Sequence, residues 1–132
     1  MENIIENNKI IAEFLNLTSQ VIFEQVFAVS ENGKTNFYKK DELKFHSDWN
    51  WLMKVVEKIE NLKPISFLEG RNWQGFEITI YKALNTNINY CIIKYIKEGG
   101  YMIISNEFSK ESKIEAVCNA CIKFIKWYNE NK

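Results

Sequence analysis

The sequence predicts a single α+β domain over residues 1–132, made mainly of an antiparallel sheet (a hairpin plus a meander) packed with three helices. A three-layer α-β-α sandwich is the alternative architecture. Three stretches carry apolar residues at helical spacing, and the strand-like runs between them are separated by Asn and Gly turns. The chain has 132 residues, of which 46% are hydrophobic, enough for one domain with its own core.

The middle helix is the clearest element, and we expect the rest of the chain to pack around it. It is predicted over Ser47–Leu62, with Ser47 as its cap and Pro64 preventing its continuation. The predicted core face consists of Trp49, Leu52, Met53, Val56 and Ile59, and a flank consists of Trp51, Val55 and Leu62. This apolar arc is wide, so the helix should contact both a sheet and a second helix.

Two further helices are predicted at the ends of the chain. The first lies within Asn3–Leu17 and should begin near Asn8, because Asn7-Asn8 weakens its middle. The last runs over about Ser109–Asn129, with Ser112 or Ser109 as its cap. Its core face should hold Ile114, Val117, Cys118, Cys121, Ile125 and Tyr128, and its second flank Ala116, Ala120, Phe124 and Trp127. The small alanines favour close packing, with the Trp51 flank of the middle helix as the expected partner.

The strands are predicted from composition and alternation. Val21–Ser30 and Thr35–Lys39 flank Asn32-Gly33, a sequence typical of a tight hairpin turn. From Phe76 to Tyr81 apolar and polar residues alternate, as in a half-buried strand. Two more strands follow, Tyr90–Ile96 and Tyr101–Ser105, which complete an antiparallel meander.

Charge, cysteine content and hydropathy argue against several classes of protein. The formal net charge is zero and Arg71 is the only arginine, which argues against a nucleic-acid partner. Three cysteines, an odd number, do not suggest a secreted disulfide framework. Glu2 and Glu6 do not fit the basic start of a signal peptide, and no apolar run is long enough for a membrane span. We therefore expect a cytoplasmic protein with reduced thiols and no membrane partner.

Three segments together resemble a group of small, mostly uncharacterised phage and prophage proteins of Bacteroidetes type that carry a phage ABA-sandwich-like domain. They are NKIIAEFLNL, FHSDWNWLMKVVEKIE and ESKIEAVCNACIKFIKWYNE, which occur in the order of the family and cover about a third of the chain. The middle segment is the most specific. The resemblance implies a phage-associated α+β protein, in the host cytoplasm if phage-encoded, and supplies no catalytic motif.

The sequence carries no catalytic motif, and we expect no catalytic residue, metal site or cofactor. Cys118-x-x-Cys121 lies within a helix on its apolar face, so we interpret both thiols as structural rather than as a redox or zinc pair. His46-Ser47-Asp48 contains the residue types of a hydrolase triad, but consecutive residues cannot converge in that geometry. No glycine spacing matches a phosphate-binding loop.

The loop Glu69–Gly75 contains the most suggestive local chemistry. Arg71 can bind a phosphate or carboxylate with two parallel hydrogen bonds, and Trp73 offers a stacking surface. Tyr81 and Tyr90 complete the predicted ligand-binding set of Arg71, Trp73, Tyr81 and Tyr90. The alternative is an ordinary surface loop whose Trp73 packs on the core.

The leading hypothesis is a non-enzymatic phage- or prophage-type binding protein, with an anti-defence role as one form. It would sequester a small nucleotide signal or occlude a host protein, and its 14% aromatic content suits an interaction surface. The broad apolar helical faces also allow a homo-oligomer. The alternatives are a small enzyme of unknown reaction, using His46 or a carboxylate, and a weak nucleic-acid-binding accessory protein using Lys39, Lys40 and Lys44.

Overall fold

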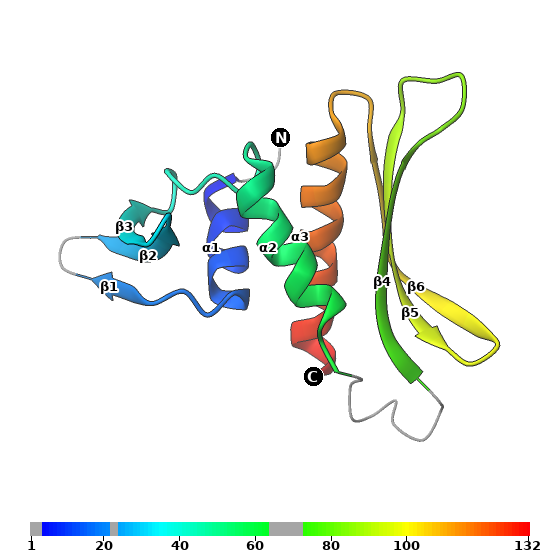
Figure 1. The fold of residues 1–132 in the computed structure, drawn as a ribbon, viewed down its shortest axis with the longest axis horizontal. Coiled ribbons are helices and arrows are strands. Elements are labelled where there is room, and N and C mark those ends of the chain that lie inside the picture. Colours follow the sequence, from blue (N-terminus) through cyan, green and yellow to red (C-terminus); the bar gives the residue numbers. More distant parts are fainter. Residues whose placement is uncertain (1–3, 22–23, 64–72) are drawn as a thin grey trace.

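The computed structural model describes residues 4–21, 24–63 and 73–132, and it arranges them in three layers. A small sheet lies on one side, three helices lie in the middle, and a larger sheet lies on the other side (Figure 1). The predicted α+β class, with a hairpin, a meander and three helices, is confirmed. The helices lie between the two sheets, which is the reverse of the layer order in an α-β-α sandwich.

The small sheet consists of β1 (Ser19–Val21), β2 (Gln25–Glu31) and β3 (Lys34–Lys39), antiparallel in that order. The predicted hairpin is confirmed: Asn32 and Gly33 have φ of 50° and 79° and join β2 to β3. The single strand predicted over Val21–Ser30 is wrong at its beginning. Val21 belongs to the separate strand β1, which folds back on β2 so that Ser19 lies opposite Phe27.

The larger sheet is the predicted meander, with β4 (Trp73–Lys82), β5 (Asn89–Lys97) and β6 (Gly100–Ser109) in that order. Gly99, with φ of 82°, turns the chain between β5 and β6. A bulge interrupts the β5–β6 pairing, because Ile93 lies opposite Ser105 whereas Lys94 lies opposite Ile103. Ile104 is therefore an extra residue in β6, and the strand alternation changes parity there.

Helix α1 (Ile4–Phe14) begins earlier than expected and runs through the two asparagines. The prediction that Asn7-Asn8 weakens the helix is wrong because Asn8 has a tertiary role. Its side chain is only 2% exposed, and its Nδ2 donates hydrogen bonds to the carbonyl oxygens of Lys40 (2.8 Å) and Leu43 (3.2 Å). Two bonds to the segment before α2 offset the modest helix propensity of Asn.

Helix α2 (Trp49–Glu60) is capped by Asp48, whose Oδ1 accepts a hydrogen bond from the Asn50 backbone at 2.9 Å. The prediction of Ser47 as the cap is therefore wrong by one residue. Burial of Leu52, Val56 and Ile59 is confirmed, but Trp49 is 39% exposed and Trp51 is buried instead. The Trp51 ring packs edge-on against the rings of Tyr38 and Phe45, at centroid distances of 5.0 and 5.3 Å respectively. This flank of α2 is therefore buried against β3 and the segment before α2.

Helix α3 (Lys113–Asn131) holds the central position that the sequence suggested for α2. It contacts all three strands of the larger sheet and both other helices, so both of its predicted apolar faces contribute to the core. Its cap is Ser112, whose hydroxyl accepts from the Glu115 backbone at 3.1 Å. The expected packing of Trp51 on the alanine flank is wrong, because Trp51 is directed toward the small sheet.

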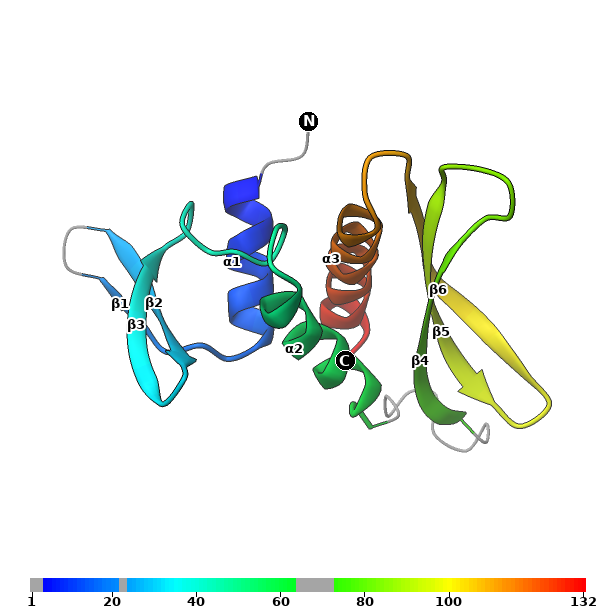
Figure 2. The same ribbon diagram turned by 45° about the horizontal axis from the view of Figure 1, so that its top comes forward.

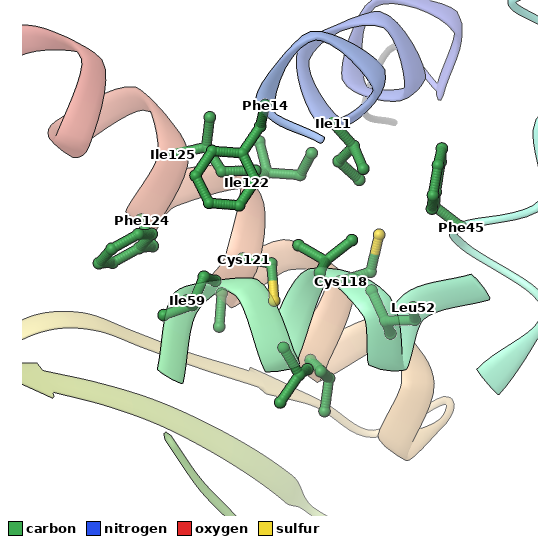
Figure 3. Close-up of a cluster of buried hydrophobic side chains, with 14 of the residues drawn as sticks. Ile11, Phe14, Phe45, Leu52, Ile59, Cys118, Cys121, Ile122, Phe124 and Ile125 are labelled. Carbon is green, nitrogen blue, oxygen red and sulfur yellow. The ribbon is translucent and has the colours of Figure 1, made fainter. Parts of the chain in front are cut away.

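The core between the helices is continuous and apolar. Figure 3 shows side chains of α1, α2 and α3 converging, including Ile11, Leu52, Ile59, Cys118 and Cys121. These side chains are at most 7% exposed. None of the described helices combines the length and the apolar character that a membrane crossing requires.

Candidate binding face on the larger sheet

The two faces of the β4–β6 sheet have different environments. Cys91, Ile93 and Tyr95 of β5 are fully buried on the side of α3. Side chains alternate along a strand, so Tyr90, Ile92, Lys94 and Ile96 point to the opposite side. No described element lies on that side (Figures 1 and 2). We call it the outer face.

Three aromatic side chains cross the outer face in one row near one end of the sheet. Tyr81, Tyr90 and Phe108 lie on β4, β5 and β6, and the strand register places them directly opposite one another. The Tyr81 and Tyr90 rings stack with centroids 5.2 Å apart and planes 13° apart, and the Tyr90 and Phe108 rings are 6.0 Å apart. Tyr81 is 41% exposed and Phe108 is 59% exposed. This row is a preformed aromatic surface that reaches solvent.

The apolar character continues toward the other end of the sheet. Tyr101 and Ile103 of β6 are 56% and 49% exposed. The Lys94 ammonium lies 4.5 Å from the centroid of the Tyr101 ring, a cation–π contact. The apolar members of the outer face, in chain order, are Tyr81, Tyr90, Ile92, Ile96, Tyr101, Ile103 and Phe108.

The outer face carries little charge. Among its described positions the charged side chains are Glu77 and Lys94, which lie opposite each other on β4 and β5. One acid and one base leave no net charge on the face. It therefore provides no extended positive surface of the kind that a phosphate backbone requires.

The structure brings together two of the four residues predicted to bind a ligand. Tyr81 and Tyr90 form the stacked pair, whereas Arg71 lies outside the described residues. The Trp73 backbone starts β4 opposite Lys97, eight residues from Tyr81, or roughly 26 Å along the strand. The Trp73 side chain is also outside the described part. The stacked tyrosines and the Trp73 backbone thus lie at opposite ends of β4.

Sequence reasoning missed Phe108, Tyr101 and Ile103 as members of this face. Phe108 was missed because the last strand was expected to end at Ser105, whereas β6 continues to Ser109. Tyr101 and Ile103 lie on the same face as Phe108 only because the bulge changes the alternation between them. The run of apolar residues at 101–104 could have indicated that this strand has apolar side chains on both faces of the sheet.

The three cysteine thiols are free and buried in the interior. Burial raises the pKa of Cys91 to about 12 and that of Cys118 to about 11, and it raises the pKa of Cys121 well above its ordinary value. Neutral thiols at physiological pH are poor nucleophiles and poor metal ligands. Over the described ranges, no group of three or more His, Cys, Asp or Glu residues is placed to hold a metal ion.

The segment His46-Ser47-Asp48 does not form a catalytic arrangement. Asp48 accepts the hydrogen bond that caps α2, and His46 and Ser47 are both exposed. A triad would require the carboxylate to orient the imidazole, whereas the Asp48 carboxylate accepts a hydrogen bond from the helix backbone.

Comparison with known proteins adds no further assignment: no family model matches the chain, and no curated protein or solved structure shows significant similarity to it.

Proposed function

We propose that this is a non-enzymatic binding protein of phage or prophage type that occludes a host protein through the outer face of its β4–β6 sheet. The observation that carries the proposal is the exposed aromatic and aliphatic surface formed by the row Tyr81–Tyr90–Phe108 together with Tyr101 and Ile103. Monomeric proteins seldom leave a contiguous surface of this kind uncovered unless it binds something. The phage resemblance supports a host protein as the target, and an anti-defence role is the form that such occlusion would take.

The dimensions of the outer face fit a protein partner. Three strands spaced about 4.8 Å apart, each with about nine residues rising roughly 3.4 Å, give a footprint on the order of 400 Å² before side-chain relief is added. This is the size of the largest apolar patches on soluble proteins, which are often functional. Tyrosine is enriched among the residues that supply most of the binding energy of protein interfaces.

The charge pattern defines the chemistry of the partner. With Glu77 and Lys94 side by side and no other described charge on the face, the partner should be largely apolar and carry at most a matching pair of opposite charges. A nucleic-acid strand could stack on the aromatic row, but its phosphates would find one lysine, already held over Tyr101. The observations therefore favour a protein over a nucleic acid.

Site-specific photo-cross-linking in the native host tests this proposal. A photoreactive phenylalanine analogue replaces Phe108 in one variant and Phe37 in a matched control, because both side chains are aromatic and more than half exposed but lie on different sheets. We expect one discrete protein adduct from position 108, none from position 37, and loss of the adduct when Tyr81→Ser is added.

Each other outcome overturns the proposal. An adduct between two copies of the chain would make the outer face a homodimer interface, and a nucleic-acid adduct would assign it to strand binding. Equal adducts from both positions would show non-specific contact, and no adduct from position 108 would remove the face from consideration.

A further inference from the structure

A hollow of about 440 Å³ lies where the beginning of α1, the segment before α2 and the beginning of α3 meet. It is separate from the outer face, and its volume falls in the range of small-molecule sites. The helix beginnings that border it are near one another at one end of the helical layer (Figure 1). Its described lining residues are Ile4, Asn7, Asn8, His46, Ser112, Glu115, Cys118 and Asn119.

Asn8 lines this hollow and is buried, and its amide oxygen can accept a hydrogen bond. Its Nδ2 uses both hydrogens on the carbonyls of Lys40 and Leu43, which fixes the orientation of the amide. Among residues 4–21, 24–63 and 73–132, no hydrogen bond reaches its Oδ1. The side chain is 2% exposed, and a buried amide oxygen is stabilised when it receives a donor.

Glu115 contributes a second acceptor. Its Oε1 accepts a hydrogen bond from the Ser109 hydroxyl at 2.7 Å, which orients the carboxylate. Within the described part of the chain, Oε2 has no such partner. An ionised carboxylate can only accept hydrogen bonds, so Glu115 and Asn8 together select a ligand that donates N–H groups.

The remaining lining residues restrict the ligand further. Asn7, Asn119 and His46 supply groups that can donate or accept, and Ile4 and Cys118 supply apolar wall. No lysine or arginine occurs among the described lining residues, and the Glu115 carboxylate repels anions. A phosphate group is therefore disfavoured, whereas a flat polar heterocycle is suited to the site.

We propose that this hollow binds an uncharged heterocycle with an exocyclic amino group, of the adenine or cytosine type, as a free base or nucleoside without phosphate. The amino group donates to Asn8 Oδ1 and Glu115 Oε2, and the amides of Asn7 and Asn119 meet the ring nitrogens or carbonyl. Bidentate amide-to-adenine and carboxylate-to-cytosine amino contacts are established pairings for these side chains. This site is independent of the proposed protein-binding face.

Nuclear magnetic resonance titration tests the assignment through the asparagine side-chain NH₂ signals. Cytosine is compared with uracil and adenosine with inosine, because each pair differs chiefly in an amino group replaced by a carbonyl. We expect cytosine and adenosine to shift the Asn7 and Asn119 signals at concentrations up to roughly 1 mM, with uracil, inosine and adenosine monophosphate at least about tenfold weaker. Asn119→Ala should weaken binding by about tenfold, whereas Asn129→Ala, on the same helix outside the hollow, should not.

Several results would overturn the proposal. They are the absence of shifts with every heterocycle, equal binding of cytosine and uracil, tighter binding of the monophosphate than of the nucleoside, and binding of putrescine alone. The last would reassign the hollow to a cationic amine held by Glu115. Loss of binding in Asn129→Ala as well would show that the shifts report a general change in α3 and not the hollow.

Discussion

Replacing Asn8 with Ala should destabilise the fold by about 1–2 kcal/mol. The side chain is 2% exposed and makes two hydrogen bonds, 2.8 and 3.2 Å long, to backbone carbonyls before α2. Each such bond contributes about 0.5–1.5 kcal/mol net, so losing both costs about 1–3 kcal/mol. Alanine has the higher helix propensity, which returns up to about 0.7 kcal/mol.

Urea unfolding measures this loss directly. With a denaturant slope of about 2 kcal/mol/M, the transition midpoint should fall by roughly 0.5–1 M. Asn7→Ala is the matched control, because it makes the same change one position earlier on α1, where no side-chain hydrogen bond of Asn7 is present among the described residues. The control midpoint should stay constant or rise. Equal midpoints for the two variants would refute the view that Asn8 anchors the segment 40–43 to α1.

Three further perturbations follow from the same structure. Leu52→Ala should cost about 2–5 kcal/mol in urea unfolding because Leu52 is fully buried, and a cost near zero would contradict its place in the core. The pKa of Cys91 is raised to about 12, so its neutral thiol stabilises the fold fully below its unfolded pKa and this contribution is lost as pH rises from about 9 toward 12. The melting temperature should therefore fall less between pH 8 and pH 10 for Cys91→Ala than for the wild type, as measured by thermal unfolding. Phe108→Ser should leave the free energy of unfolding in urea within about 0.5 kcal/mol of wild type, because a surface residue is changed, and a larger loss would show that Phe108 stabilises the fold and is not simply part of the binding face.

The sequence was most informative where local patterns and burial agree. The Asn32-Gly33 hairpin was predictable because the two positive φ angles favour those residues whatever lies around them. The apolar faces of α3 were predictable because both of them pack against other elements, three strands and two helices, while the charged residues of the helix stay exposed. Tyr81 and Tyr90 could be predicted as binding residues from their aromatic side chains. The position of Phe108 beside them could not, because it requires β6 to extend beyond Ser105.

Other features depend on contacts between distant segments, which no local pattern records. From the sequence, Asn8 is a residue of low helix propensity. Only the structure shows that its side chain donates hydrogen bonds to the carbonyl oxygens of Lys40 and Leu43. Trp51 and not Trp49 is buried because Tyr38 and Phe45 occupy that side of α2. The hollow at the beginnings of α1 and α3 joins residues more than a hundred positions apart, which is why no local pattern in the sequence connects His46 with Glu115.

The bulge at Ile104 has a consequence for how this protein can change by mutation. It makes Tyr101 and Ile103 share a side with Phe108, although strict alternation would place them with Ser105 on the side of α3. Deleting the single codon for Ile104 would remove only the extra residue, so that Ile103 directly precedes Ser105 and β6 alternates regularly. Tyr101 and Ile103 would stay on the outer face with Phe108, and Met102 would stay on the side of α3. A lineage can therefore lose the bulge by one in-frame deletion and still keep the exposed apolar surface.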